Sequence, residues 1–380
     1  MLNLYEGLRQ SNLTKFDVLL TGYVPSAETV QAVGKIGRDV KFNAGTKPGS
    51  FFWVLDPVMG DNGKLYIPED EVPEYKGLLR EADLILPNQF EAELLSDTPI
   101  TELKSLAAAI QVLHKKYQVP HVIITSLRLT RDNHTISSRA PSKPTSSAGS
   151  GTHTPSETQH LDAATSHPST WPRSTTTAKS QINLEEEEEN LTVIGSTATS
   201  DYKPRLFRID TPQLPLFFSG TGDMFAALII PRLIEAVQAV PELSSKASWR
   251  SPDDVPAEEL PLAKAAQKVL ASMQAVLART TETCQESMKA YDARAAKDGC
   301  TDGDDAEEET ITRRHLALVN ASEVKVVRYV KELLDPPDLE RFRPRAIREG
   351  AQVPHDVGEG KADEFEVRHL GVGPEGEGAM

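Results

Sequence analysis

Short apolar runs alternate with amphipathic stretches through the first 130 residues of the chain. The alternation has the spacing of strands and helices in βαβ units, which predicts an α/β fold with a mainly parallel sheet. Ser26 is expected to cap one helix and Thr101 another, because each precedes apolar residues at helical spacing. The runs that predict buried strands are residues 17–20, 51–55, 82–86 and 122–124.

The segment from 131 to 189 has a different composition. Of the 50 residues from 131 to 180, 21 are Ser or Thr, and an acidic run follows at 185–189. Such a segment buries too little apolar surface to offset its ordering entropy, so we expect a disordered insert. A loop insertion is favoured over a regulatory phosphorylation tract.

Regular patterns return at residue 190. Residues 191–195 and 206–209 predict a hairpin or adjacent strands, and 214–218 lead into a Gly-rich turn. One α/β domain from 1–130 and 190–347 is expected, followed by a flexible tail at 348–380. The remaining expected elements are a helix at 224–240, a polar loop at 241–261, a long helix at 262–295, an acidic linker at 298–309 and a closing strand with its approach at 315–327.

Composition restricts the function classes. The 380-residue chain carries a formal net charge of −15, which argues against nucleic acid or an anionic membrane as a partner. Backbone amides and a metal can still hold a phosphate. The two cysteines, Cys284 and Cys300, form no disulfide framework. We see no signal peptide and no apolar run of 18 residues, so a cytoplasmic protein, with the nucleus as a second location, is expected.

The Gly220-Thr221-Gly222-Asp223 segment opens an apolar helix. Glycines allow backbone amides to approach a ligand, and amides at a helix N-terminus bind anions. Asp223 would then lie beside a phosphoryl group as a base for an attacking alcohol. A tight turn with an acidic residue in the first helical turn is the alternative for this motif.

Two further polar motifs follow predicted strands. Asp56 and Asp61 leave the strand at 51–55, and their carboxylates suit Mg²⁺ that bridges phosphates. Asn88 and Glu91 follow the strand at 82–86 and can face one cleft. Solvated acids in a turn and an ordinary capping box are the respective alternatives.

The residues of these motifs and their order along the chain resemble those of the pyridoxal kinases of the ribokinase-like superfamily, over residues 1–130 and about 190–335. The resemblance implies a three-layer α/β/α sandwich and transfer of the ATP γ-phosphate to the 5′-hydroxymethyl of vitamin B6. It also implies Mg²⁺ or another divalent cation, help from K⁺, and a homodimer. The blocks that carry it are residues 4–9, 20–23, 56–61, 66–70, 87–95, 124–126 and 220–223.

The resemblance also implies roles for individual residues. Asp223 would be the general base, with Gly220, Thr221 and Gly222 as the anion hole, and Tyr23 would pack on the pyridine ring. Asp56 would lie by the ATP phosphates and the metal, with Asp61 the main metal contact. Residues 62–66 would belong to a flap over ATP. The other nucleotide and metal residues would be Asn88, Glu91, Thr125 and Ser126 near phosphate and cations, and Leu214 and Leu216 near adenine.

The sequence departs from the family at two places. Leu86 stands where the family usually has Thr, so one oxygen ligand for a monovalent cation is absent and a K⁺ requirement is left open. The resemblance begins after the family's first strand and first substrate-contacting segments, so we expect low stability and little activity if the chain is made in this form. A non-catalytic binding homologue and a hydroxymethylpyrimidine kinase are the alternative functions.

Overall fold

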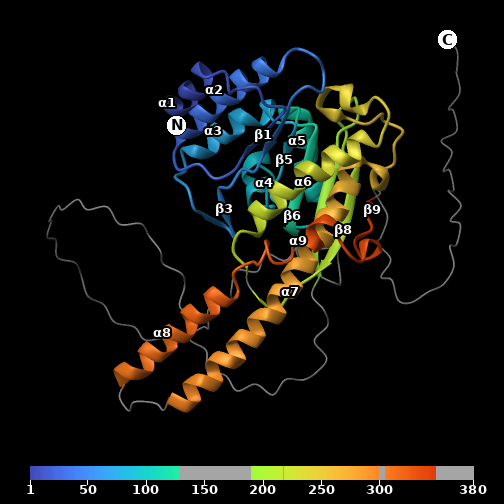
Figure 1. Cartoon of the computed structure of the whole chain (residues 1–380). Coiled ribbons are helices and arrows are strands. Elements are labelled where there is room, and N and C mark those ends of the chain that lie inside the picture. The colour runs from blue at the N-terminus through green and yellow to red at the C-terminus, as the bar shows by residue number, and fades with distance from the viewer. Residues whose placement is uncertain (128–189, 217, 299–303, 348–380) are drawn as a thin grey trace, which may run out of the picture. The chain divides into compact units, whose positions relative to one another are not determined.

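The computed structural model of the chain describes residues 1–127, 190–216, 218–298 and 304–347 (Figure 1). Within these residues the centre is a seven-stranded sheet in the order β1-β2-β5-β6-β7-β8-β9. In this sheet β1, β2, β5 and β6 pair in parallel, and β7, β8 and β9 continue it in antiparallel pairs. The strands are β1 (Val18–Thr21), β2 (Phe52–Leu55), β5 (Leu84–Ile85), β6 (His121–Leu127), β7 (Asn190–Thr197), β8 (Leu206–Pro212) and β9 (Arg345–Ala346), with a separate hairpin of β3 (Gly60–Asp61) and β4 (Lys64–Leu65).

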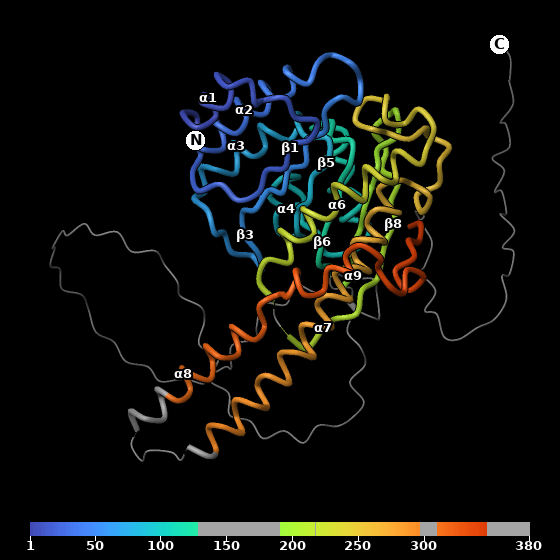
Figure 2. Tube along the Cα trace, viewed as in Figure 1, coloured from blue at the N-terminus to red at the C-terminus, as the bar shows by residue number. Residues whose placement is uncertain are grey.

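Helices cover both faces of the sheet, and β2 shows how the layers divide. Trp53 and Leu55 pack into a core with helices α2 to α5, whereas Phe52 and Val54 pack on the opposite side with α6 and α7. Figure 2 shows the path of the chain through these strands and helices. The three-layer α/β/α prediction is confirmed. The helices are α1 (Leu2–Gln10), α2 (Ala27–Ala44), α3 (Glu71–Leu78), α4 (Gln89–Ser96), α5 (Leu103–Tyr117), α6 (Thr221–Gln238), α7 (Pro261–Asp298), α8 (Asp304–Ala321) and α9 (Val330–Leu334), with short 3₁₀ turns at Leu79–Glu81, Leu243–Ser245, Ala247–Trp249, Ala257–Glu259 and Leu339–Phe342.

Helix starts agree with the predicted caps in part. Ser26 caps α2 as predicted, because its hydroxyl accepts a hydrogen bond from the Thr29 amide at 3.3 Å. The prediction that Thr101 caps α5 is wrong: Glu102 is the N-cap residue, and the Ser105 hydroxyl accepts from the amides of both Thr101 and Glu102.

The chain after α7 differs from the sequence prediction. Part of the expected acidic linker and of the expected strand at 315–327 lies in helix α8. The physical reason is the pairing of α8 with α7, which includes a two-pronged ion pair from Arg314 to Asp292 at 2.9 and 3.1 Å. The strand that closes the sheet is β9, which pairs with β8. The predicted insert at 131–189 and the tail at 348–380 lie outside the described residues.

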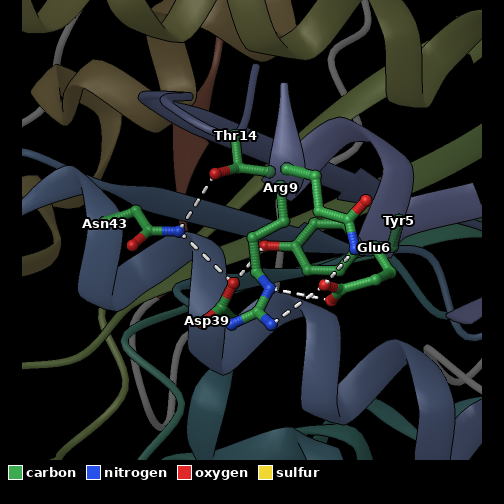
Figure 3. Close-up of polar contacts among 7 residues, drawn as sticks. Tyr5, Glu6, Arg9, Thr14, Asp39 and Asn43 are labelled. Carbon is green, nitrogen blue, oxygen red and sulfur yellow. Dashed lines mark hydrogen bonds and ion pairs between the residues drawn. The ribbon is translucent and has the colours of Figure 1, made fainter. Parts of the chain in front are cut away.

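Helix α1, which the apolar pattern did not predict, is attached to α2 by polar contacts (Figure 3). The Tyr5 hydroxyl donates to an oxygen of Asp39 at 2.5 Å, and the Asn43 amide donates to Asp39 and to Thr14. Burial and the neighbouring Asp39 raise the pKa of Tyr5 to about 12. No residue of α1 is fully buried, so these polar contacts do much of the work of holding the helix in place.

A buried histidine pair lies at the opposite end of the sheet from the strand-end motifs. His114 bonds to the carbonyl of Val119 at 2.7 Å and to the Ser196 hydroxyl at 2.8 Å. His121 bonds to the Thr197 hydroxyl and to the carbonyl of Ser248. Among the helices described, none is long and apolar enough to cross a membrane.

Candidate active site

The polar strand-end motifs meet at one edge of the sheet. Asp56 follows β2, Asn88 follows β5, and Thr125 lies near the end of β6, all in the parallel part of the sheet. Asn88 forms a parallel β-bridge with Thr125, and the Thr125 amide donates to the Pro87 carbonyl at 3.1 Å. Carboxyl ends of parallel strands form the usual ligand site of open α/β sheets. Asp56, Asn88 and Thr125 therefore lie at one edge of the sheet.

A cavity of about 250 Å³ joins this edge to the start of α6. Asp56 is 7% exposed, and burial followed by the charge of Asp223 raises its pKa to about 7. Asp223 itself is exposed. The carboxyl group of Asp56 therefore has a pKa near neutral pH, whereas that of Asp223, which lines the same cavity, is open to solvent. The cavity is lined by Leu20, Gly22, Asp56, Asp223 and Ala226.

Helix α6 begins three residues earlier than the sequence predicted, at Thr221. Gly220 is its N-cap residue with φ of +79°, a left-handed conformation that side chains rarely adopt. Thr221, Gly222 and Asp223 therefore form the first helical turn, where backbone amides have no partner within the helix. Because the Met224 amide donates to the Gly220 carbonyl at 3.0 Å, the turn is already closed when a ligand arrives.

The Asn88–Glu91 pair forms the capping box that was the alternative for this motif. The pair also forms hydrogen bonds to Met59 and Gly60. The Asn88 side chain accepts from the Glu91 amide at 2.9 Å and donates to the Gly60 carbonyl at 2.7 Å. Glu91 accepts from the amides of Asn88 and Met59, both at 2.9 Å. Burial raises the pKa of Glu91 to about 7 against the lowering effect of these amides. The motif thus links α4 to the chain that follows β2.

The end of β6 carries a local distortion. Pairing between β6 and β7 shifts register between Ile124 and Leu127. Ser126 in this bulge has φ of +62° and is exposed, whereas Thr125 is half-buried. A non-glycine residue in the left-handed region costs on the order of 1 kcal/mol, and such positions cluster at functional sites. A bulge of this kind bends the strand and interrupts its regular pairing.

The remaining predicted site residues lie around this centre. Asp61 is exposed in β3, where its carboxylate accepts from the Asn62 amide at 2.7 Å. Tyr23 is 60% exposed, and it is the neighbouring Gly22 that lines the cavity. Leu214 and Leu216 are half-buried in the connection from β8 toward α6.

The oxygen donors can be tested against a divalent cation. Within the described residues, no group of three or more His, Cys, Asp or Glu side chains could hold a metal ion by itself. Both Glu91 oxygens already accept from backbone amides. Asp56 and Asp223 line the cavity, and the exposed Asp61 accepts through both oxygens from its neighbour Asn62, at 2.7 and 2.9 Å. These carboxylates suit Mg²⁺ that is held by one or two carboxylates together with substrate phosphates. The residues therefore fit a cation that arrives with a nucleotide.

Sequence reasoning missed several residues of the site. Leu20 and Ala226 line the cavity, although neither was predicted as a site residue. Leu20 is 39% exposed and lies near the end of the edge strand β1. Its position near a strand end is the feature of the sequence from which it could have been predicted as a site residue. Gly60 and Phe90 also lie in contact distance of each other, which depends on tertiary structure alone.

Comparison with known proteins finds similar kinases. Residues 13–160 match the sequence model of the phosphomethylpyrimidine kinase family. The chain is 29% identical over 282 residues to a putative pyridoxal kinase of Schizosaccharomyces pombe, covering 74% of this chain and 68% of that protein. It is 40% identical over 116 residues to human pyridoxal kinase, covering 29% of this chain and 36% of that protein.

Solved structures share the fold. Pyridoxal kinase from Leishmania donovani in complex with ADP and pyridoxamine aligns with a TM-score of 0.52 and 19% identity, covering 90% of this chain and 78% of that one. A putative phosphomethylpyrimidine kinase from Bacteroides thetaiotaomicron, solved with pyridoxal, aligns with a TM-score of 0.52 and 18% identity, covering 91% and 80%. These similarities show that the chain shares the fold of these kinases.

Proposed function

We propose that this chain is a pyridoxal kinase that transfers the γ-phosphate of ATP to the 5′-hydroxymethyl group of pyridoxal, pyridoxine or pyridoxamine. The observation that carries the proposal is the placement of Asp223 in the first turn of α6, on the cavity that Asp56 also lines. Relatives named pyridoxal kinase, and related structures that hold ADP and vitamin B6 forms, supply the substrate class.

The chemistry follows from the positions of the chain's own groups. The exposed Asp223 carboxylate accepts the proton of the substrate alcohol as the alcohol oxygen attacks the γ-phosphorus. The bond from the γ-phosphorus to the bridging oxygen breaks, and ADP leaves with the electron pair. The free amides of Thr221 and Gly222 hold the charge that gathers on the transferring phosphoryl group. Leu20 and Ala226 give the cavity an apolar wall for a flat ring.

The cation belongs to the proposal as well. Asp56 and Asp61 would hold Mg²⁺ together with the nucleotide phosphates. When bound, Mg²⁺ neutralises charge on the phosphates during transfer. K⁺ is proposed only as an auxiliary ion, since Leu86 supplies no side-chain oxygen beside Pro87.

The proposal is tested by measuring ATP-dependent formation of pyridoxal 5′-phosphate by the purified chain and by an Asp223→Asn variant. We expect the variant to lose about 10²-fold or more in kcat, the usual contribution of a general base. Asp97→Asn is the matched control. Asp97 is exposed at the end of α4 with φ of +55°, a conformation that Asn also tolerates, so the control should fold and act like the parent.

Absence of turnover by a folded chain that still binds ATP would favour the non-catalytic binding homologue. Equal activity of the parent and the Asp223→Asn variant would contradict the role of Asp223 while leaving the kinase activity in place. Both results are distinct from a folding failure, which circular dichroism of each variant reveals.

A hydroxymethylpyrimidine kinase is the second candidate, because residues 13–160 match the phosphomethylpyrimidine kinase model. The same assay with hydroxymethylpyrimidine as the acceptor compares the two substrates directly. A larger kcat/KM for the pyrimidine would assign the chain to that activity.

A homodimer and a cytoplasmic location complete the proposal. Light scattering of the purified chain measures the first, and a fluorescent fusion in living cells measures the second.

A further inference from the structure

We infer that Asn88, Phe90 and Glu91 form a clamp that positions the β3–β4 hairpin, and that Glu91 acts on phosphoryl transfer through backbone amides and not as a metal ligand. The inference rests on the proposed kinase function and adds a positioning role for three residues at the start of α4. It also names Gly60, at the base of the hairpin, as the point where the clamp closes.

Glu91 uses its whole carboxylate on backbone donors. One oxygen accepts from the Met59 amide at 2.9 Å and from the Gly60 amide at 3.4 Å. The other oxygen accepts from the Asn88 amide at 2.9 Å. Glu91 is 4% exposed, so these bonds form away from water, where hydrogen bonds to a charged acceptor are strong. The carboxylate joins the start of α4 to the two residues that lead into β3.

The Asn88 side chain also binds Gly60, at its carbonyl group. Its side-chain amide donates to the Gly60 carbonyl at 2.7 Å, so both backbone groups of Gly60 are bound, one by Asn88 and one by Glu91. Asn88 is itself fixed by its bridge to Thr125 at the end of β6. Through Asn88, the position of Gly60 is therefore fixed relative to the central sheet.

Phe90 closes the clamp sterically. A Cβ atom on Gly60 would lie 2.8 Å from Cε1 of Phe90 and 2.3 Å from the carbonyl oxygen of Lys64. Only glycine fits between the ring and the opposite strand of the hairpin. Any side chain here would force the hairpin away from α4.

The hairpin itself is built to keep a fixed shape. Asn62 and Gly63 both have positive φ, +51° and +74°, as in the two-residue turns that match the twist of paired strands. The Tyr66 amide donates to the Met59 carbonyl at 2.8 Å, which ties the end of the hairpin to the residue that Glu91 holds. A clamp at Met59 and Gly60 therefore determines where Asp61, at the exposed edge, is placed.

The experiment compares Glu91→Gln, Phe90→Ala and Phe90→Leu with the parent chain. Glutamine replaces one acceptor oxygen by an NH₂ group, which faces an amide donor, while alanine removes the ring. Glu93→Gln is the matched control, since Glu93 lies on the same helix and its carboxylate accepts from the Ile100 amide at 2.7 Å, away from the hairpin.

Four quantities are measured: kcat, KM for ATP, the Mg²⁺ concentration for half-maximal rate, and amide hydrogen exchange across residues 59–66. We expect Glu91→Gln and Phe90→Ala to raise KM for ATP or lower kcat by about tenfold, as misplacement of a positioning group does. Exchange across the hairpin should rise in both variants, and the Mg²⁺ requirement should stay within about twofold of the parent. Phe90→Leu should recover most of the loss, and Glu93→Gln should resemble the parent.

A rise of about tenfold in the Mg²⁺ requirement of Glu91→Gln, with unchanged hairpin exchange, would make Glu91 a metal ligand and overturn the inference. Unchanged exchange in Phe90→Ala would overturn it as well. If the parent chain shows no kinase activity, the proposed function fails, and hydrogen exchange still decides whether the clamp exists.

Discussion

The carboxyl groups of Asp56 and Asp223 line one cavity, and the negative charge of Asp223 adds to burial in raising the pKa of Asp56 to about 7. The two acids come from chain segments separated by more than a hundred residues, one at the end of β2 and one in the first turn of α6. Bringing like charges together in a partly buried space is unfavourable for the free chain. Such pairs occur where a site must bind a cation or move a proton.

The first prediction concerns Asp56 and stability. Its pKa in the folded chain lies above the value of 3.8 for an unperturbed Asp, so the folded state retains the proton more tightly than the unfolded state. Stability contributed by the protonated form is lost as pH rises from about 4 through 7. Asp56→Asn should remove this loss and stabilise the nucleotide-free chain at pH 8 by on the order of 3 kcal/mol, while lowering kinase activity.

Urea unfolding of the parent and the variant at pH 5 and pH 8 measures the difference. Asp97→Asn serves as a control in which the change in stability has the opposite sign. The ion pair with Lys76 lowers the pKa of Asp97, so losing this carboxylate should destabilise the chain at pH 8. A gain in stability from Asp56→Asn that is the same at both pH values would contradict the account.

The second prediction separates two glycines of the α6 motif. Gly222 has ordinary backbone angles, and a Cβ there would meet no atom within 4 Å, so Gly222→Ala should leave the free energy of unfolding within about 0.5 kcal/mol. Gly220 has φ of +79°, so Gly220→Ala should destabilise by about 1 kcal/mol. If phosphate approaches the first-turn amides, Gly222→Ala should still raise KM for ATP or lower kcat by about tenfold.

Thermal unfolding and steady-state kinetics of both variants provide the comparison. A Gly222→Ala variant with parental kinetics would show that no ligand approaches this turn closely.

How far the sequence predicts the structure is clearest at the strand ends. The apolar runs before Asp56, Asn88 and Thr125 have strand length and end in polar residues, so their convergence at one sheet edge follows from parallel topology. The α6 motif was also identified, although its helix starts at Thr221. In each case a local pattern and a general rule of fold geometry were sufficient.

The contacts that give these residues their surroundings could not be predicted in this way. Glu91 was expected near the metal, but which of its oxygens meet the Met59 and Gly60 amides depends on how α4 packs against the chain after β2. The first part of the region at 315–327 was misread as a strand, because residues up to Ala321 lie on helix α8, which pairs with α7 through the Arg314–Asp292 ion pair. Long-range partners of this kind leave no periodic signal.

The third prediction uses the bulge in β6. Ser126 has φ of +62°, so replacement by glycine should stabilise the chain by about 0.5–1 kcal/mol and replacement by valine should destabilise it by a larger amount. Thermal unfolding of the two variants tests the backbone argument. If Ser126 also contacts nucleotide phosphate, Ser126→Gly should raise KM for ATP despite its greater stability. A valine variant as stable as the parent would contradict the left-handed assignment.

The fourth prediction concerns the buried histidines. Burial lowers the pKa of both His114 and His121 to about 4, below the 6.5 of an unperturbed histidine. Each ring is neutral and fully bonded: His114 donates to the Val119 carbonyl and accepts from Ser196, so protonation would replace its acceptor nitrogen by a second donor. The unfolded state binds protons first as pH falls.

The stability that the neutral rings contribute is therefore fully present above pH 6.5 and is lost as pH falls toward 4. Each ring should account for on the order of 3 kcal/mol over this range, less where the two titrations interact. Urea unfolding at pH 7.5, 6, 5 and 4.5 measures the slope. His114→Gln should lower stability at pH 7.5 and flatten the slope below pH 6.5, because the variant has one proton fewer to take up on unfolding. His315→Gln, at an exposed position in α8, should leave the slope unchanged, and equal flattening by both variants would contradict the assignment to the buried pair.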